Sequence, residues 1–302
     1  MKYSLVITGA TGFVGSNLTK YFLNLNYDVN LIVRPNSDLS NLNVNNKNLK
    51  IFRYDNDLNS LISFFKATNP ICTFHLASNF TAEHNSFQID NLVSSNITFG
   101  LHLLEAMKEA NVKTLINTGT SWQHFNNEEY NPVCLYAATK QAFESLVEYY
   151  VQAEDFKIVT LKLFDTYGET DTRPKLINLL NQFTKENIEL KLSPGEQLIN
   201  LIHVNDVCIA FETAMKLIEK LANGTHKKYV VKHSKSYSLK EVISVFETVV
   251  QKKINIVWGG KPYRKREVMK LWEKGESLPN WAANLSLEEG FKKMLDRKSL
   301  WD

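Results

Sequence analysis

Short apolar runs alternate with longer segments of helical periodicity through the first half of the chain. Residues 15–25 and 97–110 are two of the helical segments. The apolar runs, which we expect to be strands, lie at residues 4–8, 29–33, 49–53, 73–76, 114–117 and 158–163. This alternation predicts an α/β fold built on a doubly wound parallel sheet, with a nucleotide site at the carboxyl ends of the strands.

After residue 164 the pattern becomes irregular. Helices are expected near 175–185, within 198–221, after 238 and from 287, and strands near 189–192, after 198 and near 255–258. These pieces are too few for a second large sheet, so we expect a smaller C-terminal substrate lobe interleaved with the first domain. The predicted division assigns residues 1–164 and 198–232 to a nucleotide-binding domain, and residues 165–197 and 233–302 to the lobe.

Composition narrows the classes of partner. The chain has 302 residues, of which 44% are hydrophobic, and can bury a full core. Its 35 basic and 32 acidic residues are spread along the chain, so no nucleic-acid or membrane partner is expected. The densest basic run, 261–270, is expected to be a solvated or anion-facing loop. Three isolated cysteines fit neither a disulfide framework nor a metal site, which indicates a reducing cytoplasm.

A glycine motif lies between the first expected strand and the first expected helix. In Gly-x-x-Gly-x-x-Gly, the missing side chains permit a tight turn and let main-chain N–H groups approach a pyrophosphate, which the helix N-terminus stabilises. This context favours a Rossmann-like dinucleotide site over a purely structural turn. The predicted contacts are Gly9, Thr11, Gly12, Phe13, Val14 and Gly15.

The end of the second expected strand bears on the choice of cofactor. It reads Val33-Arg34-Pro35, without an acid. A carboxylate there would bind the ribose hydroxyls of NAD, whereas a guanidinium can pair with the 2′-phosphate of NADP. We therefore predict NADP, with NAD less favoured. The alternative for Arg34 is an exposed loop arginine.

Tyr136 and Lys140 are four positions apart, so on a helix they share one face. A nearby ammonium lowers the pKa of a tyrosine from its ordinary value of about 10. We expect Lys140 to act on Tyr136 in this way. Tyr136 would then exchange a proton with a carbonyl or hydroxyl group while a hydride moves to or from a nicotinamide. No metal-ligand spacing accompanies the pair, and no metal is expected.

The glycine spacing and the Tyr-x-x-x-Lys pair resemble the extended branch of the short-chain dehydrogenase/reductase superfamily, the epimerase/dehydratase type, which acts on sugar nucleotides. The resemblance implies a catalytic hydroxyl just past the fifth strand, where we place Thr120, with Ser121 and Thr118 as alternatives. It also implies an acid near the adenine at Asp55, although a loop-capping aspartate is the alternative. The further cofactor contacts that it implies are Leu76, Ala77, Ser78, Asn96, Lys140 and Phe164.

The second half of the chain departs from the family pattern at three positions. Phe164-Asp165-Thr166-Tyr167-Gly168 resembles the family's Phe-Asn-x-Tyr-Gly-Pro, with Asp165 in place of Asn and Glu169 in place of Pro. Ile199 stands where the family has an arginine that contacts the phosphates of the sugar nucleotide. The candidate cations for the diphosphate are therefore Arg173, Lys175, Arg264 and Arg266. The other expected substrate contacts are Ser121, Trp122 and Asp165, although Trp122 is equally explained as a packing residue.

Within the family, the chain looks most like the 4-ketoreductases of the abequose and paratose synthase type. That resemblance implies a homodimer that uses NADPH to reduce a nucleoside-diphosphate keto sugar at carbon 4, for lipopolysaccharide or capsule biosynthesis. The alternative enzyme is a 4-epimerase that keeps NAD bound and recycles it. A third hypothesis is a non-catalytic regulator that senses NADP, against which the catalytic pair counts. The nucleotide base and the sugar stay open.

Overall fold

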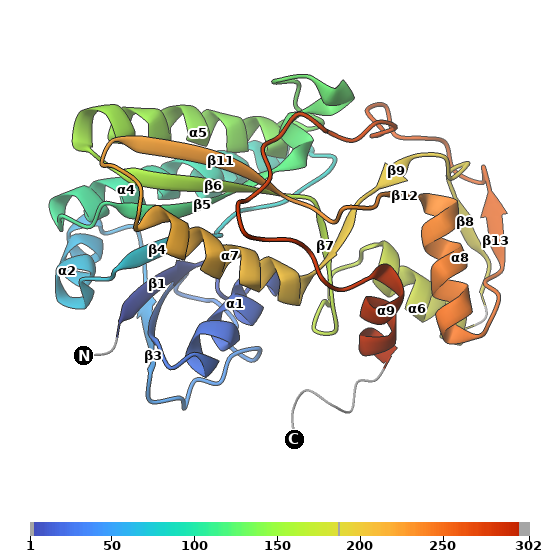
Figure 1. The fold of residues 1–302 in the computed structure, drawn as a ribbon, viewed down its shortest axis with the longest axis horizontal. Helices are drawn as coiled ribbons and strands as arrows, with labels where there is room; N and C mark the ends of the chain where they lie inside the picture. The colour runs from blue at the N-terminus through green and yellow to red at the C-terminus, as the bar shows by residue number, and fades with distance from the viewer. Residues whose placement is uncertain (1–2, 187, 296–302) are drawn as a thin grey trace.

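The computed structural model describes residues 3–186 and 188–295. Its centre is a seven-stranded sheet of order β11-β6-β5-β4-β1-β2-β3 in which every neighbouring pair is parallel (Figure 1). The strands are β1 (Ser4–Thr8), β2 (Asp28–Val33), β3 (Leu49–Arg53), β4 (Cys72–His75), β5 (Thr114–Thr120), β6 (Lys157–Leu163) and β11 (Thr225–Val231). This order confirms the predicted α/β fold. The strand order reverses between β1 and β4, and a ligand site is expected where their carboxyl ends meet.

Helices cover both faces of this sheet. On one face, α1 (Phe13–Asn24) and α7 (Val204–Ile218) bury a cluster that includes Phe22 and Phe211. On the other face, α2 (Leu58–Thr68), α4 (Phe99–Glu109) and α5 (Leu135–Glu154) bury a second cluster that includes Phe65 and Phe143. The two apolar layers hold the strands rigidly, so the loops at the strand ends are positioned by the sheet.

Sequence periodicity did not predict β11. Its first four residues are Thr225, His226, Lys227 and Lys228, and only its last three positions are buried apolar residues. The strand lies at the edge of the sheet, paired with β6. An edge strand that carries charges on its first half lacks the continuous apolar run by which the inner strands were recognised.

The predicted helix at 97–110 begins earlier than expected. Helix α3 (Ile89–Val93) passes through a π-helical segment, Ser94–Thr98, into α4. Such wide turns are rare and occur often at functional sites. Here the segment carries Asn96, one of the predicted cofactor residues, and turns its side chain into the interior.

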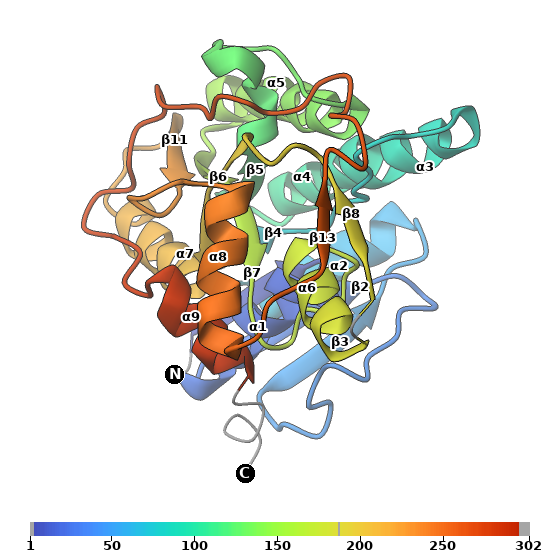
Figure 2. The same ribbon diagram turned by 90° about the vertical axis from the view of Figure 1, so that its right-hand side faces the viewer.

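The smaller lobe has a core of its own, which includes Leu180, Phe246 and Phe291. Its helices, α6 (Leu176–Glu186), α8 (Leu239–Val250) and α9 (Leu287–Leu295), gather on one side of the molecule (Figure 2). The three strand pairs of this region are β7 (Asp165–Tyr167) with β10 (Leu201–His203), β8 (Leu190–Leu192) with β13 (Ile256–Trp258), and β9 (Leu198–Ile199) with β12 (Tyr237–Ser238). The residue limits proposed for the two domains stay a prediction.

Two connecting segments matter for the site. The first follows β5 and spans residues 121–131; we call it the catalytic loop. The second, residues 259–286 between β13 and α9, is called the strap (red in Figure 1); it runs from the lobe to the catalytic loop and back to α9. Within the described residues, no helix is both long and apolar enough to cross a membrane.

Candidate active site

The glycine loop between β1 and α1 is closely packed. Gly9 has a φ of +71°, and a Cβ atom there would lie 2.6 Å from the main-chain nitrogen of Ala77. A Cβ atom at Gly15 would lie 2.2 Å from the carbonyl oxygen of Gly9. Both positions therefore require glycine. The N-cap of α1, Gly12, brings no side chain to the first main-chain N–H groups of the helix, which suits the binding of a phosphate there.

A cavity of about 850 Å³ lies beside this loop at the carboxyl ends of the strands; we call it the cofactor cavity. Its size and its glycine-lined floor fit a dinucleotide. Seven of the predicted cofactor residues line it, namely Gly9, Thr11, Gly12, Arg34, Leu76, Ala77 and Ser78. Phe13, Val14 and Gly15 form the first turn of α1 behind the loop.

Four other predicted cofactor residues do not line this cavity: Asp55, Asn96, Lys140 and Phe164. Asp55 is exposed, while its neighbours Tyr54 and Asn56 line the cavity instead. Asn96 is buried, where its oxygen accepts hydrogen bonds from Ser78 Oγ at 3.1 Å and from the Asn79 N–H at 2.7 Å. Asn96 therefore supports the wall of the cavity from behind.

Two arginines follow or end the strands β2 and β3, and one of them lines the cofactor cavity. Arg34 is exposed and lines the cavity. Arg53, at the end of the neighbouring strand, donates hydrogen bonds to the carbonyl oxygens of Arg34 and Pro35. Sequence reasoning missed Arg53, because its position beside Arg34 follows only from the parallel pairing of β2 and β3, in which Arg53 is in register with Val33.

Tyr136 and Lys140 lie in the first turns of α5, as predicted for a helical pair. The Tyr136 hydroxyl shares a hydrogen bond with Ser78, and its ring meets the edge of Phe80 at a centroid distance of 5.0 Å. Ser78 lines the cofactor cavity, whereas Phe80 lines a second cavity in front of the lobe. Tyr136 therefore touches one residue of each cavity.

The expected effect of Lys140 on its partner is not what the structure shows. Burial raises the pKa of Tyr136 above its ordinary value, and the opposing influences are Ser78 and Arg173. Burial also lowers the pKa of Lys140 to about 8, against the influence of Glu144. The expectation of a lowered tyrosine pKa was wrong, because desolvation of the phenolate outweighs the influence of nearby charge. At neutral pH Tyr136 is a neutral phenol, the form that can give a proton.

Thr120 is the last residue of β5 and directly precedes the catalytic loop. Its Oγ1 accepts a hydrogen bond from the Trp122 N–H at 3.3 Å, and its own N–H donates to Gln123 Oε1 at 3.0 Å. Because Oγ1 serves the loop as an acceptor, the hydroxyl proton can be donated to a ligand. Ser121, the alternative, lines the second cavity, while the hydroxyl of Thr118 is buried in β5.

The second cavity, of about 550 Å³, lies between the catalytic loop, the lobe and the strap; we call it the substrate cavity. The predicted residues that line it are Ser121, Trp122, Asp165, Lys175 and Arg264, together with Ile199. Lys261 also lines it, although the sequence offered no reason to single it out from its basic run. Three cations thus border the cavity in which Ile199 replaces the family's arginine.

The other two predicted phosphate-binding arginines are engaged elsewhere. Arg173 forms two 2.7 Å contacts with the carboxylate of Asp171, and its guanidinium lies 4.5 Å from the ring centroid of Phe13. Arg266 donates a hydrogen bond to Asn131 and lies 4.3 Å from the ring centroid of Phe125. Neither lines the substrate cavity, so Arg264 is the better supported of the two arginines in the strap.

An aromatic wall leads from this cavity to Tyr136. The rings of Phe80 and Trp122 lie 5.6 Å apart. Lys175 lies 5.5 Å from the ring of Phe80, and Arg264 lies 5.4 Å from the ring of Trp122. Arg264 is also held by Glu267, with contacts of 2.8 and 3.1 Å. The cavity therefore offers an apolar surface beside the phenol and positive charge at both ends of that surface.

Glu169, which replaces the family's proline, has a structural partner. Its carboxylate lies 3.1 Å from His203 Nε2, and both side chains are buried. Although burial opposes the charged form, the hydrogen bond from His203 holds the pKa of Glu169 below its ordinary value. Glu169 therefore ties the segment after β7 to the end of β10, outside both cavities.

Among the described residues, no group of three or more His, Cys, Asp or Glu side chains could hold a metal ion.

Comparisons with known proteins agree with this geometry. Residues 5–231 match the model of the NAD dependent epimerase/dehydratase family. The chain is 26% identical over 297 residues to a CDP-abequose synthase of Salmonella muenchen, covering 97% of each chain. It is also 26% identical to a UDP-glucuronate 4-epimerase of Thermodesulfobacterium geofontis, covering 98% of this chain and 96% of the relative. Among solved structures, a UDP-glucose-4-epimerase of Stenotrophomonas maltophila with bound NAD and formylated UDP-arabinopyranose superposes with a TM-score of 0.85 at 18% identity, covering 98% of each chain. The two relatives named above act on nucleotide sugars. Because the family model matches three quarters of its length, the chain belongs to the NAD dependent epimerase/dehydratase family.

Proposed function

We propose that the protein is a 4-ketoreductase that uses NADPH to reduce the keto group of a nucleoside-diphosphate deoxysugar, in the biosynthesis of surface polysaccharides. The observation that carries the proposal is the position of Tyr136, which contacts Ser78 of the cofactor cavity and Phe80 of the substrate cavity. A reduction at a ketone needs a proton donor at this point, and a neutral phenol supplies one.

The residues have separate roles in the proposed reaction. When bound, NADPH supplies a hydride to the carbonyl carbon. Tyr136 gives its proton to the carbonyl oxygen, so the C=O double bond becomes a C–O single bond with a new C–H bond at the carbon and a new O–H bond at the oxygen. The phenolate then regains a proton from solvent. Thr120 donates a hydrogen bond to the same oxygen as negative charge develops there. The Lys140 ammonium stabilises the transient phenolate, and the resemblance to the family implies that it would also hold the cofactor ribose.

The preference for NADPH is supported at the end of β2. Arg34 lines the cofactor cavity, and Arg53 donates hydrogen bonds to the carbonyl oxygens of Arg34 and Pro35, so positive charge gathers at the end of β2. Guanidinium groups bind phosphate oxygens by paired hydrogen bonds. A strand end with two cations and no acid disfavours the ribose contact that NAD would use.

The substrate class is supported by the substrate cavity and by the curated relatives. Lys175, Lys261 and Arg264 bring positive charge that suits a diphosphate. Phe80 and Trp122 bring an apolar surface next to Tyr136 that suits a sugar with few hydroxyl groups on that face. The CDP-abequose synthase of Salmonella muenchen matches over nearly its whole length.

A 4-epimerase is the second candidate. The observation in its favour is the full-length similarity to a UDP-glucuronate 4-epimerase. An epimerase would keep NAD bound and return the hydride to the same sugar, whereas the reductase would consume NADPH.

The proposed quaternary state in either case is a homodimer. It is supported by exposed apolar side chains on α3 and α5, namely Ile89, Val93 and Tyr149.

The experiment is a cofactor-turnover assay. The purified protein is incubated with NADPH or NADH and a panel of nucleoside-diphosphate 4-keto sugars, and the absorbance of the reduced cofactor is followed. Loss of NADPH in proportion to keto sugar supports the proposal. Interconversion of 4-epimers without net cofactor loss, by protein that carries NAD from purification, would establish the epimerase instead.

A further inference from the structure

The strap is attached to the catalytic loop at several points besides its two arginines. The ring of Trp272 stacks on His124 at a centroid distance of 3.6 Å and an interplanar angle of 9°. The main-chain N–H of Glu273 donates to Asn127 Oδ1 at 2.9 Å. Trp272 also lines the substrate cavity. The wall of that cavity therefore depends on where the strap lies against the loop.

A buried lysine lies beneath this stacked pair. Lys162, on β6, donates a hydrogen bond to His124 Nε2 at 2.8 Å, and its Nζ lies 5.3 Å from the ring centroid of Trp272. Burial, with the neighbouring Lys162 charge second, lowers the pKa of His124 to about 4. The imidazole is therefore neutral at neutral pH, and its Nε2 accepts the hydrogen bond of the ammonium while its Nδ1 faces the carbonyl oxygen of Glu128 at 3.2 Å.

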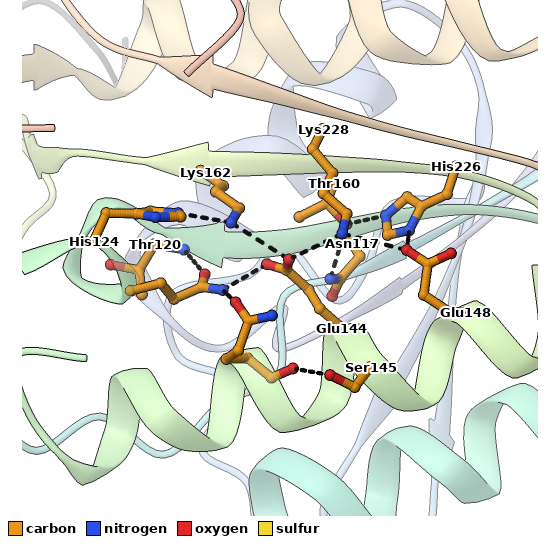
Figure 3. Close-up of polar contacts among 12 residues, drawn as sticks. Asn117, Thr120, His124, Glu144, Ser145, Glu148, Thr160, Lys162, His226 and Lys228 are labelled. Atoms are coloured by element: carbon orange, nitrogen blue, oxygen red, sulfur yellow. Dashed lines mark hydrogen bonds and ion pairs between the residues drawn. The ribbon is translucent and has the colours of Figure 1, made fainter. Parts of the chain in front are cut away.

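The same lysine reaches the catalytic helix (Figure 3). Its Nζ lies 3.4 Å from Glu144 Oε2, and the two side chains are only 4% and 1% exposed. The other carboxylate oxygen of Glu144 accepts a hydrogen bond from Gln123 Nε2 at 2.8 Å. Gln123 in turn accepts the main-chain hydrogen bond of Thr120. Hydrogen bonds and an ion pair thus join His124, which stacks on the strap, to Lys162, to α5 one turn beyond Lys140, and to the main-chain N–H of Thr120.

We propose that Lys162 is a positioning residue that fixes the strap and the catalytic loop on helix α5. It would thereby hold the wall of the substrate cavity and Thr120 in one fixed arrangement. Among the described residues Lys162 lines neither cavity and has no contact with Tyr136; it acts through Glu144 and through His124, which lines the substrate cavity. A buried ion pair adds little net stability compared with apolar packing, and its best attested use is to specify one arrangement among several. Gly119 leaves room for this arrangement, because a Cβ atom there would lie 3.1 Å from Gln123, Glu144 and Lys162.

The test separates the hydrogen bond of Lys162 from the packing around it. His124→Phe keeps a flat ring that can stack on Trp272 but removes the acceptor for the ammonium. Lys162→Arg keeps a cation that can reach both partners and serves as the rescue variant. Lys228→Met is the matched control, because Lys228 lies 3.8 Å from the same Glu144 carboxylate but has no contact with His124 among the described interactions.

Two measurements are made on each full-length variant. Amide hydrogen exchange of strap and catalytic-loop peptides reports whether the two segments stay in place, and it does not depend on which reaction is catalysed. In His124→Phe we expect exchange of both segments to rise roughly tenfold or more, since a hydrogen bond to a charged group is lost. Lys162→Arg and Lys228→Met should exchange like the wild type.

The kinetic measurement rests on the proposed function. With NADPH and keto sugar, His124→Phe should show a raised KM for the sugar nucleotide and a lowered kcat, while the Kd for NADPH stays within about twofold. Wild-type exchange and kinetics in His124→Phe would overturn the proposal, as would an equal change in Lys228→Met. If the wild type reduces no keto sugar, the proposed function fails, but the exchange result still supports or overturns the role of Lys162.

Discussion

The cofactor cavity and the substrate cavity differ in how the chain builds them. The described residues that line the cofactor cavity lie between Gly9 and Phe99, at or after the ends of β1 to β4, in the π-helical segment or at the start of α4. The substrate cavity is lined by residues from Phe80 to Met294, from the catalytic loop, the lobe and the strap. Consecutive parallel strands must meet at one edge of the sheet, so local motifs suffice to locate the first cavity. The second depends on segments that meet only through tertiary packing.

The largest expected effect lies where the two cavities meet. Tyr136→Phe removes the proton donor but keeps the ring against Phe80. Because the proton is needed mainly in the transition state, kcat should fall by ~10²–10⁴-fold. The Kd for NADPH should hardly change. Steady-state kinetics and a fluorescence titration check both values, and near wild-type turnover would remove Tyr136 from the mechanism.

The pH dependence of kcat/KM tests the role of Lys140. Burial lowers the pKa of Lys140 to about 8, so the ammonium dominates below that pH and is lost above it. Burial raises the pKa of Tyr136, which keeps the phenol protonated in the same window. We therefore expect kcat/KM to be level below about pH 8 and to fall roughly tenfold per pH unit above it.

Lys140→Arg is the control for this assignment, because a guanidinium stays charged throughout that pH range. Its residual activity should lack the alkaline decline. Lys140→Ala should instead lower both turnover and NADPH affinity. A decline that persists unchanged in Lys140→Arg would assign the titration to another group.

A smaller effect is expected at the far end of the cofactor cavity. Arg34→Ala should weaken NADPH binding about tenfold, as expected for loss of an exposed, charge-assisted hydrogen bond to phosphate. NADH binding should change little. Isothermal titration with each cofactor measures the difference, and Arg53→Ala tests whether the second guanidinium contributes. Equal losses for NADPH and NADH, or a wild-type preference for NADH, would contradict the NADP assignment.

The smallest effects are expected in the substrate cavity, where several cations share one ligand. Arg264→Ala should raise the KM for the sugar nucleotide about three- to tenfold, because Lys175 and Lys261 remain and Glu267 already neutralises part of the charge. Arg266→Ala should raise it less, since Arg266 contacts Asn131 and Phe125 and not the cavity. If neither variant changes KM, the diphosphate is bound elsewhere.

The difference between the two cavities also explains which features could be predicted from the sequence. The inner strands and the glycine loop were predicted because an apolar run and a steric requirement for glycine are local signals. Arg53 and Lys261 were missed because only tertiary packing brings them to the sites, Arg53 beside Arg34 and Lys261 into the lining of the substrate cavity. The pKa shift of Tyr136 was predicted with the wrong sign, because spacing revealed the nearby lysine but not the burial of the phenol.

Isotopic labelling of the transferred hydride tests directly whether the protein is a ketoreductase. The protein is supplied with NADPH that carries deuterium at the transferred position, together with a nucleoside-diphosphate 4-keto sugar. The product is then analysed by mass spectrometry and NMR. A ketoreductase predicts one deuterium at carbon 4 for each NADPH oxidised, and Tyr136→Phe should slow its appearance. Product that forms without deuterium, or 4-epimers that interconvert while added NADPH stays intact, would show that the protein is not an NADPH-dependent ketoreductase.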